Sequence, residues 1–92
     1  MDEPDGFPGA DLVKEGLADL ARDVESVPAL LVSIGAPRLR RIGLAIPKTF
    51  PSPERRLYAL LEADGPDSAH ARYNALIRRL VSYERAAECA AR

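Results

Sequence analysis

The chain has 92 residues, of which 47% are hydrophobic, 29% charged and 5% aromatic. This balance is typical of one small globular domain, which buries only about 60–65% of its unfolded surface and is marginally stable alone. A single cysteine and the lack of a long apolar run exclude an intrachain disulfide, a cysteine-rich metal site and a membrane span. The acidic start lacks the basic and then apolar pattern of a signal peptide, so the cytoplasm is the expected location.

Charge is divided unequally along the sequence. Residues 1–26 hold eight acids and two bases, a net charge of −6, whereas residues 27–92 hold six acids and eleven bases, a net charge of +5. Two interpretations follow: the two halves neutralise each other in the fold, or one of them faces a partner of opposite charge.

The first ten residues are rich in proline, glycine and acids and have no periodicity, so residues 1–10 are expected to form a flexible acidic arm. Residues 11–92 are expected to form a single helical domain. Gly16 costs the first helix about 1 kcal/mol relative to alanine, and the close approach of another helix would be a reason for it. The apolar stripe that predicts this helix consists of Val13, Leu17, Leu20, Val24 and Val27.

Four acids on the first predicted helix lie four residues apart and form a second stripe: Asp11, Glu15, Asp19 and Asp23. Such a stripe is typical of a solvated helix face. It is also what a ligand for a basic surface would present, so these four residues are candidates for contact with a partner.

Two short helices are expected over residues 26–42. Ser26 is a suitable N-cap for the first, and Gly35 is a suitable end for it. Pro37 then opens the second, so that the two helices meet at the Gly35–Ala36 corner. Prolines punctuate residues 47–53, and Phe50 within this extended connector favours a packed loop over a free one.

The sequence Ser52-Pro53-Glu54 predicts a helix start, and Asp64-Gly65-Pro66 predicts its end. The helix between them, residues 54–63, is expected to turn four side chains inward: Leu57, Tyr58, Leu60 and Leu61.

The last predicted helix is the longest, capped by Asp67 or Ser68 and running to about Ala90. Its apolar seam either packs within the chain or forms an interface with a partner or a second copy. Together these elements predict an all-α fold, a small bundle of four to five helices. The seam consists of Ala69, Tyr73, Leu76, Leu80, Tyr83, Ala87 and Ala90.

No motif for catalysis, phosphate binding, a cofactor or a metal is present. His70, the only histidine, has Asp67 nearby but is best interpreted as a surface or capping residue. Cys89 is best interpreted as a small packing residue. The sequence therefore predicts a protein that is not an enzyme and binds another macromolecule.

Adjacent arginines occur three times, as Arg40-Arg41, Arg55-Arg56 and Arg78-Arg79. The guanidinium group donates paired hydrogen bonds that suit phosphate, so Arg40, Arg41, Arg78 and Arg79 are candidates for contact with nucleic acid or with an acidic partner. The sequence pI of about 5.8 argues against a nucleic-acid domain. A nucleic-acid-binding transcriptional regulator is therefore the second hypothesis.

Residues 30–43 and 68–86 resemble parts of small helical bacterial proteins that are paired with AbiEii-type nucleotidyltransferases in toxin–antitoxin systems. The resemblance covers about a third of the chain and carries no site residues over. It implies an antitoxin that neutralises a tRNA-modifying toxin by direct binding. A charged partner surface is compatible with this function, and either the acidic or the basic residues would make the contact.

Overall fold

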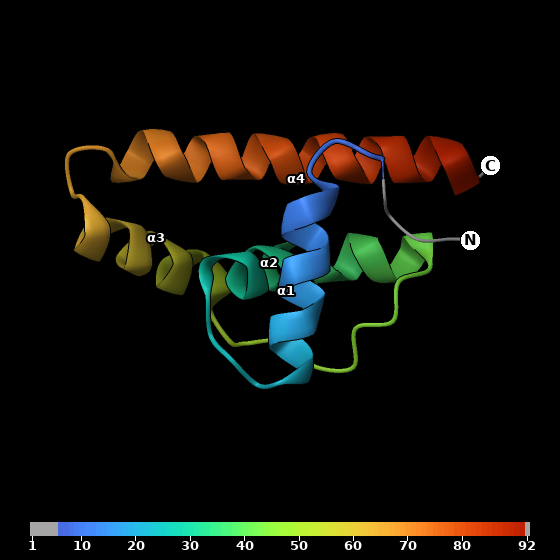
Figure 1. Cartoon of the computed structure of the whole chain (residues 1–92), viewed down its shortest axis with the longest axis horizontal. Coiled ribbons are helices and arrows are strands. Elements are labelled where there is room, and N and C mark those ends of the chain that lie inside the picture. The colour runs from blue at the N-terminus through green and yellow to red at the C-terminus, as the bar shows by residue number, and fades with distance from the viewer. Residues whose placement is uncertain (1–5, 92) are drawn as a thin grey trace.

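The computed structural model of the protein describes residues 6–91, and over this range it contains four α-helices and no strand (Figure 1). The helices are α1 (Ala10–Ala21), α2 (Val27–Ile42), α3 (Pro53–Asp64) and α4 (Ala69–Ala91). The predictions of an all-α fold and a long C-terminal helix are confirmed. Within the described range, no helix has the length and apolar character that crossing a bilayer requires.

Helix α2 is the centre of the bundle, because it contacts all three other helices. Its apolar face is closed off from solvent: Leu30, Leu31, Val32 and Leu39 are each at most 1% exposed. Helix α4 extends along the upper side of the molecule, and α1 crosses in front of α2 (Figure 1). Burial of aliphatic side chains, worth about 1.5–3 kcal/mol for each fully buried one, is the main force that holds the helices together.

The prediction of two helices over residues 26–42 is wrong, since α2 continues through Pro37 without a break. Proline lacks the N–H of the helical ladder, but its fixed φ is itself helical. The flanking Ala36 and Leu39 are buried and favour continuation of the helix. Gly35 is needed for packing and does not end the helix: a Cβ there would lie 2.8 Å from Glu84 Oε2 and 3.0 Å from Leu80 Cδ1.

Helix α1 packs closely on α2, as Gly16 predicted. A Cβ at Gly16 would lie 2.9 Å from the carbonyl carbon of Pro28 and closer still to its oxygen and to Val32 Cγ2. The helix is shorter than the apolar stripe predicted, because it ends at Ala21. Val24 beyond that end is 40% exposed, which corrects its assignment to the buried stripe.

A serine precedes each of two predicted helices, but only one of these serines caps its helix through the side chain. Ser26 is the N-cap of α2, and its Oγ accepts a hydrogen bond of 3.1 Å from the backbone N–H of Ala29. Ser52 stands at the same position before α3, but it has a positive φ of 47° and makes no side-chain cap. Proline at the first turn of α3 supplies the predicted start there.

The connector between α2 and α3 is packed, as Phe50 indicated. The backbone N–H of Phe50 donates to Ser33 Oγ at 3.2 Å, and the ring packs against the core. Ser33 in turn donates to the carbonyl of Ala29 at 2.9 Å, so one buried hydroxyl ties the connector to α2. On α3, Leu57 and Leu61 are buried as predicted, but Leu60 is 38% exposed and was wrongly placed inward.

The seam of α4 packs within the chain along most of its length. Ala69, Leu80, Tyr83 and Ala87 are buried, and Tyr73 and Leu76 are partly buried against the same core. The predicted flexible arm lies partly outside the described residues, because its acids belong to residues 1–5. Within the described part of the arm, the ring of Phe7 lies 5.8 Å from that of Tyr83, so this part contacts α4.

Candidate functional site

The predicted acidic stripe does not form a free surface. Asp11 lies on α1 and pairs with Arg79 of α4 at 2.8 Å, so one acidic candidate is bound to one basic candidate. Asp23 lies beyond the end of α1 with a positive φ of 62°, and its carboxylate is 3.2 Å from the ammonium group of Lys48. Within the described chain, Glu15 is the one member of the stripe that is exposed and makes no ion pair or hydrogen bond through its side chain.

Asp19 is the clearest correction, since it is only 7% exposed. Its carboxylate accepts hydrogen bonds from Ser26 Oγ at 2.7 Å and from Arg22 at 2.5 Å. These bonds, first that of Ser26 and then that of Arg22, hold the pKa of the Asp19 carboxyl below its ordinary value. Asp19 therefore fixes the turn between α1 and α2, and it is not available to a partner.

Each predicted arginine pair contains one arginine that is bound within the chain. Arg40 donates through Nε to the carbonyl of Ile46 at 2.9 Å, and Arg56 binds Glu25 through two hydrogen bonds of 2.9 and 3.0 Å. Arg79 is the partner of Asp11. The other three arginines are exposed and make no hydrogen bond or ion pair with the residues that the structure describes: Arg41, Arg55 and Arg78.

The two oppositely charged halves of the sequence neutralise each other in part. Three ion pairs join an acid of residues 1–26 to a base of residues 27–92: Asp11–Arg79, Asp23–Lys48 and Glu25–Arg56. All three are solvent-exposed, so each contributes little to the stability of the fold. Three of the eight acids of residues 1–26 are therefore compensated by bases of the other half within the fold.

A cluster of three charged side chains at the α2–α4 contact was not predicted. Arg38 binds Glu88 through Nε at 3.1 Å and Nη2 at 2.6 Å, and its Nη1 lies 3.3 Å from Glu84 Oε1. Glu84 is only 4% exposed. Burial raises the pKa of the Glu84 carboxyl above its ordinary value, and the charge of Arg38 opposes this shift only in part.

The two remaining candidate reactive residues, His70 and Cys89, do not lie close together. His70 is exposed at the start of α4, where Asn74 Nδ2 lies 3.1 Å from its Nε2, in place of the contact with Asp67 that the sequence suggested. Cys89 is exposed near the other end, which corrects its assignment as a packing residue. The two are about 28 Å apart along the helix axis. Among residues 6–91, no group of three or more histidine, cysteine, aspartate or glutamate side chains is placed to hold a metal ion.

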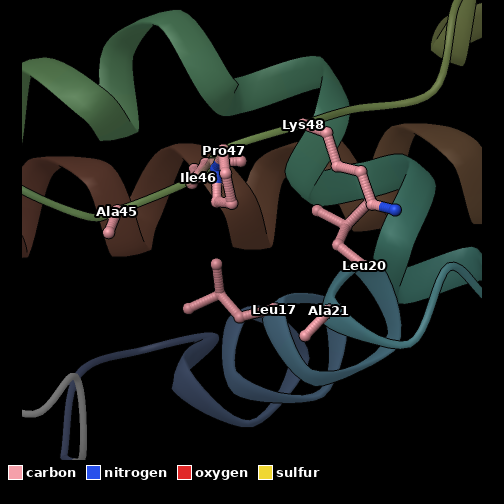
Figure 2. Close-up of a pocket in the computed structure, with 7 residues that line it drawn as sticks. All are labelled: Leu17, Leu20, Ala21, Ala45, Ile46, Pro47 and Lys48. Carbon is pink, nitrogen blue, oxygen red and sulfur yellow. The ribbon is translucent and has the colours of Figure 1, made fainter.

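An apolar pocket of about 340 Å³ lies between α1 and the α2–α3 connector, and we name it the α1 pocket. Figure 2 shows residues of α1 on one side and residues of the α2–α3 connector on the other, with the amino group of Lys48 at the end nearest Leu20. Six of its seven lining side chains are apolar. The lining residues are Leu17, Leu20, Ala21, Ala45, Ile46, Pro47 and Lys48.

The local sequence explains the apolar residues in each wall of the α1 pocket. It does not indicate that the two walls face each other. Leu17 and Leu20 belong to the apolar stripe of α1, and Leu20 is buried while Leu17 is partly exposed. Pro47 keeps the preceding residues extended, and the bond from Arg40 to Ile46 holds the connector against the end of α2. The run Leu44-Ala45-Ile46 that precedes Pro47 contains nothing to indicate that it returns to α1.

No protein-family model, no curated protein and no solved structure matches this chain.

Proposed function

We propose that this chain is a non-enzymatic protein-binding module, and that its role is that of an antitoxin which neutralises a nucleotidyltransferase toxin by direct contact. The observation that carries the proposal is the α1 pocket, which leaves aliphatic surface open in a chain whose other aliphatic side chains are mostly closed into one core. A fold of this size gains stability from any partner that binds only the folded form, which suits a protein that works in a complex.

Co-expression with the product of the neighbouring gene tests this proposal. We expect that product to inhibit growth alone, and we expect the chain to relieve the inhibition and to co-purify with it in a fixed ratio. A Leu80→Asp variant is the negative control, because a carboxylate cannot be buried unpaired at this 4% exposed position and the fold is lost. Growth inhibition that persists in the presence of the folded wild-type chain would rule out the antitoxin function.

Binding to nucleic acid is the second candidate function. It is favoured by the arginine in each pair that makes no ion pair within the described chain. Arg41, Arg55 and Arg78 are exposed and make no ion pair within the described chain, so their guanidinium groups remain available to phosphate. Phosphate contacts weaken steeply as the salt concentration rises, which gives this function a clear signature.

A mobility-shift assay with the promoter of the chain's own gene separates the two members of each pair. We expect an Arg41→Ala/Arg78→Ala double variant to lose a salt-sensitive shift if nucleic acid is the ligand. The matched control is Arg56→Ala/Arg79→Ala, which removes arginines already bound to Glu25 and Asp11. Absence of any shift at low salt would remove this second function.

A further inference from the structure

The wall of the α1 pocket that comes from the connector offers unused hydrogen-bond donors. Ala45 and Lys48 line the pocket and are exposed, and within the described chain their backbone N–H groups have no acceptor. An extended segment with free main-chain donors is a surface on which another extended chain can form backbone hydrogen bonds. A lipid chain offers no such series of acceptors, so this feature favours a peptide as the occupant.

The charges around the α1 pocket favour an acidic occupant. Lys48 lines the pocket, and Arg40 binds the carbonyl of the lining residue Ile46. Lys48 forms an ion pair with Asp23 in which both side chains are more than half exposed. An ion pair this exposed contributes little to stability, so a carboxylate of a partner can replace Asp23 at little cost.

A further large apolar side chain is exposed in the turn that follows α1. Val24, which follows Asp23 in the turn after α1, is one of two large hydrophobic side chains that the structure leaves exposed. The pocket volume of about 340 Å³ is at the lower end of ordinary ligand pockets and has room for one aliphatic or aromatic side chain with its neighbours. Interfaces commonly depend on one such anchor in a pocket.

We propose that the α1 pocket binds an extended acidic segment of a partner protein, with one large apolar side chain of that segment seated among Leu17, Ala21 and Ile46. A carboxylate of the segment pairs with Lys48, and its main-chain carbonyls accept from the free N–H groups of the connector. The inference rests on the proposed protein-binding function and names the chemistry of the partner at that site.

A short synthetic peptide tests the inference on the isolated chain. The probe has a central tryptophan flanked by glutamates, and because the chain contains no tryptophan, selective excitation reports the peptide alone. We expect saturable binding with a blue shift of the tryptophan emission. Two matched peptides complete the set: one with lysine flanks, which should bind at least about tenfold more weakly, and one with a central alanine whose binding is followed by competition.

Variants of the chain test whether the peptide binds in the α1 pocket. Ala45→Phe fills the mouth of the pocket and should abolish binding. Ala71→Phe, at another exposed alanine on α4, should leave binding unchanged. Lys48→Glu should weaken the acidic peptide about tenfold and improve the lysine-flanked one. Circular dichroism checks each fold, and Ala21→Phe replaces Ala45→Phe if the latter does not fold.

Several outcomes would overturn the inference. Equal binding of the acidic and lysine-flanked peptides would remove the charge preference, and binding that survives both pocket variants would place the peptide elsewhere. Displacement by monomeric dodecanoate that binds more tightly would identify a lipid site, and a dimer that Ala45→Phe converts to a monomer would identify a second copy as the occupant. Relief of growth inhibition by Ala45→Phe would leave the antitoxin function intact while rejecting this pocket as its contact.

Discussion

Helix α1 has two sides that meet the rest of the chain in opposite ways. Towards α2, Gly16 allows backbone contact with Pro28 and leaves no space. Towards the connector, Leu17 and Ala21 face a pocket that nothing in the described chain fills. The same helix therefore makes a tightly packed contact with α2 and leaves an open surface towards the connector. The tight contact depends on the missing side chain of Gly16, and the open surface includes the small side chain of Ala21.

The close contacts continue further along α2, where Gly35 faces Leu80 of α4. Replacing Leu80 with alanine should produce the largest effect, a destabilisation of about 2–5 kcal/mol, because it leaves a cavity in the core. Leu60→Ala removes the same atoms from a 38% exposed position and should cost much less. Chemical denaturation followed by circular dichroism measures both, and equal losses would show that Leu80 is not a core residue.

Gly16→Val addresses the closed side of α1 directly. We expect a destabilisation of about 1–3 kcal/mol, because the new side chain must displace the backbone of Pro28. Ala18→Val on the exposed face of the same helix is the control for the lower helix propensity of valine. A Gly16→Val protein as stable as this control would contradict the close contact between α1 and α2.

Glu84→Gln tests the charged cluster at the other closed contact. Because the pKa of Glu84 is raised in the folded protein, its contribution to stability is fully present below its ordinary pKa of 4.5 and is lost as the pH rises through the folded value. Glutamine removes that loss, so the variant should melt at a higher temperature than the wild type at pH 7.

The difference between the two proteins should shrink as the pH falls towards 4.5 and below, where Glu84 is protonated in both states. Comparison at each pH cancels the contributions of Asp11 and Asp19, which both proteins share. Glu62→Gln, at an exposed position, is the control and should have no comparable effect. A variant that is less stable than the wild type at pH 7 would show that the Arg38 contact outweighs the cost of burial.

The side of α1 that lines the α1 pocket should tolerate substitutions. Ala21→Leu adds apolar volume at the edge of the α1 pocket, and we expect the free energy of unfolding to change by no more than about 0.5 kcal/mol. Denaturant unfolding again provides the measurement. A loss as large as that of Gly16→Val would mean that the pocket is a strained part of the core.

Features set by neighbouring residues could be predicted, and features set by distant contacts could not. The Ser26 cap and the Pro53 helix start depend on a few adjacent residues, and both are present as predicted. The burial of Asp19 depends on a turn that brings Ser26 back to it, and the periodicity of α1 gave no sign of that turn. Continuity of α2 through Pro37 depends on the surrounding core, which outweighs the local preference for a break.

The candidate site follows the same rule. The charged residues of the sequence were recognised, but their partners lie on other helices, as Arg79 does for Asp11 and Glu88 does for Arg38. Charge counts cannot distinguish an arginine that is bound within the chain from its exposed neighbour. The α1 pocket likewise requires the connector to return to α1, and this return is a property of the whole fold.

The contact between Phe7 and Tyr83 bears on the order in which the molecule assembles. It joins residues near opposite ends of the described chain, so it closes a loop that contains all of α2 and α3. Closing a loop costs more entropy as it lengthens, although slowly, and contacts between consecutive helices face a smaller barrier. We therefore expect the pairing of α1 with α2 to form early in folding, and the contact of Phe7 with α4 to form last.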